Sequence, residues 1–159
     1  MFPPPTTRIR FREMAEADLA DIATLELFPG ASSEGWIART RRNYTQHGFG
    51  LWVTETHAGE FVGDCGLTMQ EVEGEWLVEV GWHVRSALRR RGYAAEAAGA
   101  VRETARGLGV EHLVAIIRPD NMASQGVATK IGLAFEREVH KLGGPALIFG
   151  ADLHPSEAV

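Results

Sequence analysis

The sequence predicts one mixed α/β (α+β) domain, and three observations lead to this prediction. Its 159 residues are enough for a single domain with a sizeable core. Hydrophobic residues make up 45% of the chain, which argues against disorder. Three strand-like segments follow one another in the middle, and a strand–helix–strand unit comes later. Consecutive strands favour antiparallel pairing and a crossover helix favours parallel pairing, so we expect a mixed sheet in one domain over residues 1–159.

The first half of the chain is predicted to contain one strand, two helices and three strands. After a loose tail at residues 1–5, alternation predicts a short strand at 7–11. Apolar spacing predicts a helix over 13–27, with Leu19, Ile22 and Leu25 on its buried face. A second helix is expected from about Ser33 to Gly48. The three central strands are expected at residues 49–56, 61–72 and 75–85.

The strand EWLVEVGWHVR (75–85) separates polar from apolar side chains most clearly. Alternate positions form an apolar face made of Trp76, Val78, Val80, Trp82 and Val84. The opposite face carries two titratable groups, Glu79 and His83, around Gly81. A glycine inside a strand often marks a bulge, which would reverse the side-chain order after it. The direction of Glu79 is therefore predicted more securely than that of His83.

The second half is predicted to contain a helix, a strand, a second helix and a terminal hairpin. Ala94, Ala98, Val101, Ala105 and Leu108 form one apolar stripe along the first helix. The run HLVAIIR (112–118) predicts a strand that is covered on both faces. The next helix has Asp120 or Asn121 as its N-cap and Gly132 just after its end. Two strands at 133–142 and 145–153 are expected to pair around Gly143–Gly144.

The stretch RSALRRRGYAAEA (85–97) places four arginines just before a helix. The first N–H groups of a helix are unpaired and carry partial positive charge. Gly92 would let these donors approach a ligand closely, so the pattern is compatible with a phosphate or pyrophosphate site. The alternative is a solvated arginine run before an ordinary glycine. A net charge of -5 and a pI of about 5.7 argue against a general nucleic-acid surface.

RRRGYA (89–94) resembles the acetyl-CoA signature [QR]-x-x-G-x-[GA] of the GNAT superfamily of N-acetyltransferases. The resemblance extends, in order, over nearly the whole chain. VEVGWHV resembles the fourth strand of that fold, and residues 92–135 resemble the helix, strand and N-x-x-S helix that follow. RIRFREMAEADLADIATL and GEFVGDCGL resemble the branch that contains the ribosomal-protein N-terminal acetyltransferases RimJ and RimL. The resemblance implies a mostly antiparallel sheet of about seven strands, about four helices, and splayed fourth and fifth strands.

The resemblance also implies a set of residues for acetyl-CoA. Pantetheine would pair with the backbone of Trp82, His83 and Val84. Asn121 matches a family asparagine that contacts pantetheine, although it is also a plain helix cap. Ser124 would contact the cofactor or lie near the thioester sulfur, with an ordinary first-turn serine as the alternative. The pyrophosphate would lie on the signature turn, whose residues are Arg89, Arg90, Arg91, Gly92, Tyr93 and Ala94.

Glu79 is the predicted general base for attack of an amine on the acetyl thioester. It occupies the position at which related enzymes often carry a glutamate, and its alternative is an exposed strand carboxylate. An α-amine, with a pKa of about 7.7–8.0, costs only about 1 kcal/mol to keep neutral at pH 7, so a modest base would suffice. His83 is a weaker candidate base. The tyrosine acid of many relatives is missing here, so Ser124 or water would protonate the thiolate.

The remaining reactive and aromatic residues are predicted to be mostly structural. Cys65, the single cysteine, is expected to be a buried core residue rather than an acyl carrier. The four tryptophans are core candidates, although Trp36, with Tyr44, could instead line the acceptor pocket. The six histidines show no metal-ligand spacing, so we expect no metal site.

The predicted function is acetyl transfer from acetyl-CoA directly to a primary amine in a ternary complex. The acceptor would be a protein N-terminal α-amine or a small-molecule amine. The alternative is a non-catalytic acyl-CoA-binding or regulatory domain on the same scaffold. We expect no nucleic-acid or membrane partner, because the charge balance is acidic and no apolar run approaches about 20 residues. A cytoplasmic monomer or homodimer is expected.

Overall fold

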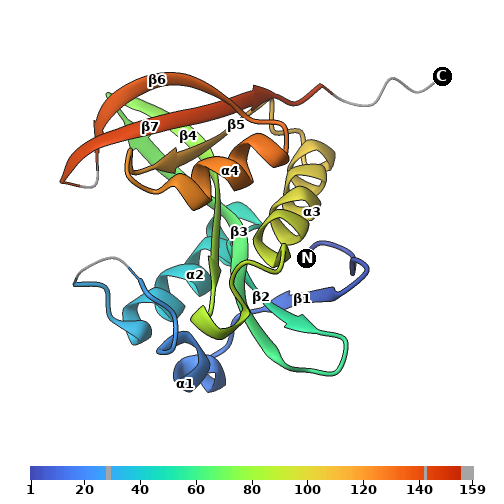
Figure 1. Ribbon diagram of the computed structural model, residues 1–159. Helices are drawn as coiled ribbons and strands as arrows, with labels where there is room; N and C mark the ends of the chain where they lie inside the picture. Colours follow the sequence, from blue (N-terminus) through green and yellow to red (C-terminus); the bar gives the residue numbers. More distant parts are fainter. Residues whose placement is uncertain (28–29, 142, 155–159) are drawn as a thin grey trace.

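The computed structural model describes residues 1–27, 30–141 and 143–154, and in these it contains seven strands and four α-helices (Figure 1). Two short 3-10 turns, Glu16–Asp18 and Ser86–Leu88, precede α1 and α3. The elements are β1 (Ile9–Glu13), α1 (Leu19–Ile22), α2 (Ser33–His47), β2 (Leu51–Thr56), β3 (Phe61–Val72), β4 (Glu75–Val84), α3 (Tyr93–Gly107), β5 (His112–Ile117), α4 (Met122–Lys130), β6 (Ala134–Lys141) and β7 (Gly144–Asp152).

The seven strands form one mixed sheet in the order β1-β2-β3-β4-β5-β7-β6. All neighbours pair antiparallel except β4 and β5, which are parallel. Within the described residues, only two residue pairs join β4 to β5, Val78 to Leu113 and Glu79 to Val114. Beyond Glu79 the two strands diverge. The predicted mixed sheet with splayed fourth and fifth strands is therefore confirmed.

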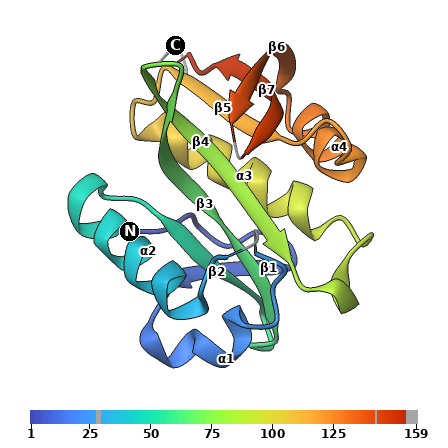
Figure 2. The same ribbon diagram turned by 90° about the vertical axis from the view of Figure 1, so that its left-hand side faces the viewer.

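Helices cover both faces of the sheet (Figures 1 and 2). The apolar stripe of α3, including Ala98 and Val101, packs with residues such as Trp52 and Leu113 from the sheet in the largest core cluster. Ala128 brings α4 to the same cluster. On the other face, α1 and α2 bury Ile22, Trp36 and Ile37 against residues of β2 and β3. The sheet is therefore packed on both faces, and β4 is its middle strand.

The segment predicted as one helix over 13–27 is shorter and less regular than expected. Its α-helical part is the single turn Leu19–Ile22, and the 3-10 turn Glu16–Asp18 precedes it. The helix starts later than predicted because β1 runs to Glu13 and Ala15 is the extended N-cap of the 3-10 turn, with its N–H donating to the buried Asp18 carboxylate at 2.8 Å. After Ile22 the N–H groups of Thr24 and Leu25 bond carbonyls three residues back, at 3.0 Å each, so the α-helix does not continue. Leu19, predicted to be buried, is 38% exposed.

Two further apolar residues, predicted to be buried, lie outside the core. Trp76 is 63% exposed because it stands at the hairpin end of β4. Leu108 is 41% exposed because α3 ends at Gly107 and Leu108 is its C-cap. The terminal hairpin of β6 and β7 is present, and Leu142, which was predicted to end the first of these strands, lies outside the described residues. In the part of the chain that the structure describes, no helix is long and apolar enough to cross a membrane.

Candidate active site

A cleft of about 970 Å³ lies where β4 separates from β5. Its lining comes from α2, β3, β4, β5, the start of α4, the end of β6 and the residues Glu26 and Leu27 before α2. Six of the residues predicted from the sequence line it together: Trp36, Glu79, Trp82, His83, Asn121 and Ser124. Val84 and the signature turn are outside this lining, because they lie beyond the cleft where β4 leads into α3.

The turn Glu73–Gly74 sets which residues face one another on β3 and β4. Both turn residues have positive φ, 51° and 82°, as in the two-residue hairpin turns that match strand twist. From the pair Val72–Glu75 to the pair Gly63–Val84 every residue is paired without a register shift. The sheet therefore has no bulge at Gly81 on this side. His83 faces the same way as Glu79, which settles the direction that the sequence left open.

Glu79 stands at the point where β4 and β5 part. Its Oε1 accepts a hydrogen bond from Thr68 Oγ1 at 3.1 Å, and the Thr68 hydroxyl accepts from Gln70 Nε2 at 3.1 Å. Burial raises the pKa of Glu79 to about 7, although the hydrogen bonds from Thr68 and the Ile116 backbone act in the opposite direction. A carboxyl with such a pKa can both accept and release a proton near neutral pH.

His83 lies four residues further along β4 and is held by a buried aspartate. Its Nδ1 is 2.8 Å from Asp64 Oδ1, and Asp64 is only 1% exposed. The other carboxylate oxygen of Asp64 accepts from Trp36 Nε1 at 2.9 Å. Burial lowers the pKa of His83, but the charge and hydrogen bond of Asp64 outweigh it, so this pKa is raised. The Trp36 ring also meets the His83 ring edge-on, with centroids 5.3 Å apart.

Gly81 leaves the wall of the cleft without a side chain between these two groups. Gly81 lies between Glu79 and His83 on β4, and Gly66 is its partner on β3. A Cβ on Gly66 would come within 2.0 Å of the Gly50 carbonyl oxygen, so the packing of β2 requires glycine there. A Cβ on Gly81 would meet its nearest neighbour, Leu51 Cδ2, at 3.7 Å, which is an ordinary contact. The missing side chain at Gly81 therefore widens the cleft rather than relieving a clash.

The signature turn presents the start of α3 as an open set of backbone donors. Gly92 is the N-cap with φ of 83°, and its carbonyl accepts from Glu96 N–H at 3.1 Å. The N–H groups of the helical residues before Glu96 have no carbonyl of the same helix to bond. Arg90 also has positive φ, 63°, a conformation that costs a non-glycine residue about 1–3 kcal/mol and often marks functional sites.

The four arginines before α3 fall into two groups. Arg85 Nε bonds the Phe61 carbonyl at 2.8 Å, and Arg89 Nε bonds the Val84 carbonyl at 3.0 Å, so both guanidinium groups brace the end of β4. Arg90 and Arg91 are exposed. Arg90 and Arg91 are therefore the arginines of this run whose side chains are best placed to contact a phosphate group that enters from solvent.

The structure places the other predicted residues as follows. Asn121 caps α4, because its side-chain oxygen accepts a hydrogen bond from the Ser124 N–H at 3.0 Å. The same residue also lines the cleft. Ser124 is half-buried. Trp82 packs on the α3 side of the sheet, so only its backbone can face a ligand between β4 and β5.

Cys65 and Tyr44 have structural surroundings. Cys65 is fully buried in the core, and burial raises the pKa of its thiol well above the usual value. The Tyr44 hydroxyl donates to the Leu51 carbonyl and accepts from Met14 N–H, so it ties α2 to the sheet and does not line the cleft. Among the described residues there is no group of three or more His, Cys, Asp or Glu side chains that could hold a metal ion.

Asp64 and Thr68 are the site residues that the sequence analysis missed. Both belong to β3: Thr68, opposite Glu79, lines the cleft, whereas Asp64, opposite His83, contacts the cleft only through its bond to His83. The signal that could have found them is the Glu73–Gly74 turn, which fixes this register.

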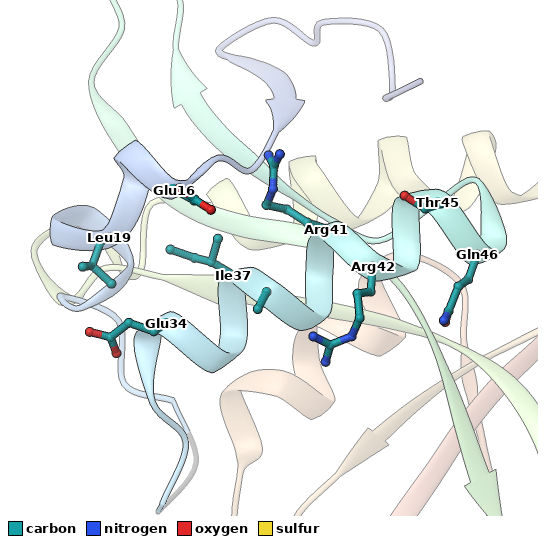
Figure 3. A pocket seen from close by; sticks show the side chains of 9 residues that line it. Glu16, Leu19, Glu34, Ile37, Arg41, Arg42, Thr45 and Gln46 are labelled. Atoms are coloured by element: carbon teal, nitrogen blue, oxygen red, sulfur yellow. The ribbon is translucent and has the colours of Figure 1, made fainter.

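A second hollow, of about 750 Å³, lies along the outer side of α2 (Figure 3). Its labelled side chains, among them Glu34, Arg41 and Gln46, are spread along the helix and do not converge on one point. It shares no residue with the cleft. The cleft is therefore the better candidate for the active site, because Glu79 and His83 line it beside the part of β4 that is not paired with β5.

The cleft and turn fit an acyl-CoA. The free edge of β4 beyond Glu79 offers backbone groups to a pantetheine chain, and the start of α3 offers N–H groups to a pyrophosphate. A mixed seven-stranded sheet that splays between its parallel central strands, with these two features, defines the acyl-CoA N-acyltransferase class of fold.

Comparison with known proteins identifies the family. The sequence model of the family described as acetyltransferase (GNAT) domain matches residues 8–134. The chain therefore belongs to this family. It is 31% identical to the uncharacterized protein YkkB of Bacillus subtilis (strain 168) in an alignment of 160 positions that covers 91% of this chain and 92% of YkkB.

Solved structures share the fold. A structure described as a GNAT-family acetyltransferase from Bordetella pertussis superposes with a TM-score of 0.81, at 21% identity, over 94% of this chain and 99% of its own. The acetyltransferase yncA from Salmonella typhimurium, solved with its cofactor acetyl-CoA, gives a TM-score of 0.73 at 19% identity, over 94% and 96% of the two chains. RimL, the ribosomal L7/L12 α-N-protein acetyltransferase in complex with coenzyme A, gives 0.77 at 14% identity, over 98% and 100%.

Proposed function

We propose that this acetyltransferase transfers acetyl from acetyl-CoA directly to a primary amine while both substrates are bound. The observation that carries the proposal is Glu79, a carboxyl with a pKa of about 7 that lines the cleft where β4 and β5 part. The acceptor would be a protein N-terminal α-amine or a small-molecule amine. The naming of RimL as an α-N-protein acetyltransferase supports the first of these, and the RimJ/RimL-like branch is part of the proposal.

The cofactor would be held by the residues predicted for it. Backbone groups of Trp82, His83 and Val84 lie on the free edge of β4, and the N–H groups of Gly92, Tyr93 and Ala94 lie at the start of α3. Asn121 and Ser124 close the cleft from the start of α4. Bound acetyl-CoA would supply an activated thioester carbonyl. N–H groups of β4 would polarise its oxygen, a kind of stabilisation that acts most strongly in a water-poor site.

Glu79 would take up the proton that the amine loses. An α-amine with a pKa of about 7.7–8.0 is partly neutral at pH 7, so a carboxylate whose pKa is about 7 is matched to it. The Thr68 hydroxyl, 3.1 Å from Glu79 Oε1, would hold the carboxylate in one orientation. Ser124 or water would return a proton to the leaving thiolate.

Two measurements test the proposal. Acetyl-CoA at a hundredfold excess over its Kd should raise the melting temperature by about 5–10 °C, because ligand linkage adds about 2.7 kcal/mol. No shift at millimolar acetyl-CoA would refute the cofactor assignment. Thiol release should then be measured with a panel of peptides with free N-termini, matched N-formylated peptides and small amines. Binding without turnover on any amine would favour an acyl-CoA-binding regulatory domain instead.

A further inference from the structure

Arg8, just before β1, holds the start of α3 by several contacts. Its Nε donates to Glu96 Oε1 at 2.7 Å, and its backbone N–H donates to Glu96 Oε2 at 2.9 Å. Its Nη1 donates to the Arg91 carbonyl at 2.9 Å. Its guanidinium carbon lies 4.3 Å from the centroid of the Tyr93 ring. One side chain therefore contacts the residue before Gly92, the residue after it and the first turn of the helix.

These contacts surround the residue on which the turn depends. A Cβ on Gly92 would lie 3.4 Å from Arg8 Nη2, so the guanidinium borders the left-handed N-cap directly. The Arg91 carbonyl belongs to the same peptide unit as the Gly92 N–H. By fixing that carbonyl, Arg8 sets the orientation of the peptide plane and the direction of the N–H on its other side.

Glu96 would otherwise oppose an anion at this place. It is a carboxylate in the first turn of the helix whose N-terminus would receive a pyrophosphate. Burial raises the pKa of Glu96, but the bonds from Thr6 Oγ1 at 2.6 Å and from Arg8 outweigh it, and the pKa is lowered. The carboxylate is thus ionised and satisfied by donors from the chain just before β1.

We propose that Arg8 is a positioning residue for the pyrophosphate of coenzyme A, acting through the Arg91 carbonyl and Glu96 to orient the N–H groups at the start of α3. The inference rests on the proposed function, since it concerns the same cofactor. It assigns Arg8 no contact with the reacting atoms. Its effect is therefore expected on cofactors that carry a pyrophosphate and on no others.

The test combines a measurement of coenzyme A binding with kinetics on two acetyl donors, one with a pyrophosphate and one without. Isothermal titration calorimetry with coenzyme A should show a Kd about tenfold higher for Arg8→Ala than for the unaltered protein. In the thiol-release assay, kcat/KM for acetyl-CoA should fall by a similar factor, whereas kcat/KM for S-acetylpantetheine, which lacks the pyrophosphate, should stay within about twofold. Arg8→Lys keeps the charge but cannot span both acceptors, so it should recover only part of the loss.

Matched variants separate positioning from general damage. Arg10→Ala removes an arginine two residues away that pairs with Glu55, and it should leave the Kd for coenzyme A unchanged. Arg8→Ala/Glu96→Gln should recover only part of the lost affinity, because removing the charge of Glu96 relieves its repulsion of the pyrophosphate but does not restore the hold on the Arg91 carbonyl. Thermal unfolding of each variant checks that it is folded.

Three results would overturn the inference. One is an unchanged Kd in Arg8→Ala, another is an equal loss with S-acetylpantetheine, and the third is full recovery in the double variant. Failure of the unaltered protein to bind coenzyme A would instead refute the proposed function itself, so the two failures are distinguishable.

Discussion

The two regions that meet at β4 are built in different ways. The turn into α3 presents backbone N–H groups around Gly92, and its nearest braces are Arg8 and Arg89. The polar face of β4 presents side chains, Glu79 and His83, each tuned by a partner on β3. A backbone site depends on dihedral angles, whereas a side-chain site depends on which residues the register places opposite. The two regions should therefore fail in different ways when they are altered.

Glu79→Gln should give the largest effect, and it acts on the side-chain region alone. A general base contributes roughly 10²–10⁴-fold, so kcat should fall by about 100-fold or more while the Kd for acetyl-CoA stays nearly unchanged. In the unaltered protein kcat/KM should rise with pH through about 7, because Glu79 of the free enzyme must lose its proton before it can accept one. Glu71→Gln, at an exposed glutamate of the same cleft, is the control. Unchanged turnover in Glu79→Gln would remove it from the mechanism.

Gly92→Val should give the next largest effect, on cofactor affinity. Left-handed φ at a β-branched residue is a severe outlier, and Gly92 has φ of 83°. The Kd for acetyl-CoA should rise by about tenfold or more, since such strain costs about 1–3 kcal/mol. Arg90→Ala and Arg91→Ala should each raise it by less than about fivefold, because exposed charges contribute about 0.2–1 kcal/mol. A larger loss from either arginine would reverse the assignment of the turn to backbone recognition.

Asp64→Asn should give the smallest effect on turnover and the clearest one on His83. Asp64 raises the pKa of His83 against the effect of burial. Without that negative charge the imidazolium loses its stabilisation and the pKa of His83 should fall. Titration of the histidine ring signals by nuclear magnetic resonance measures this, with the half-buried His112 of β5, which bonds Asp152 and Glu136, as an internal reference. An unchanged pKa for His83 would mean that Asp64 is only a partner for Trp36.

The sequence predicted the backbone region better than the side-chain region. The turn 89–94 is contiguous, so its glycine and the helix after it could be recognised directly, as could Glu79 by its parity on β4. Asp64, Thr68 and Arg8 could not, because each reaches its partner from another strand or from before β1. The predicted helix at 13–27 failed for a related reason, since Glu13 is held in β1 by its pairing with Trp52 of β2.

The divergence of β4 from β5 leaves an open strand edge in the middle of the sheet. From Val80 to Val84, β4 is paired with β3 on one side, and in the described structure its pairing with β5 stops at Glu79. An open edge is a template for adding another strand, but this one faces a cleft rather than the outer rim. Its amides should exchange with solvent faster than those of β3 and become protected when coenzyme A binds. In that sense the cofactor would act as a missing strand of the sheet.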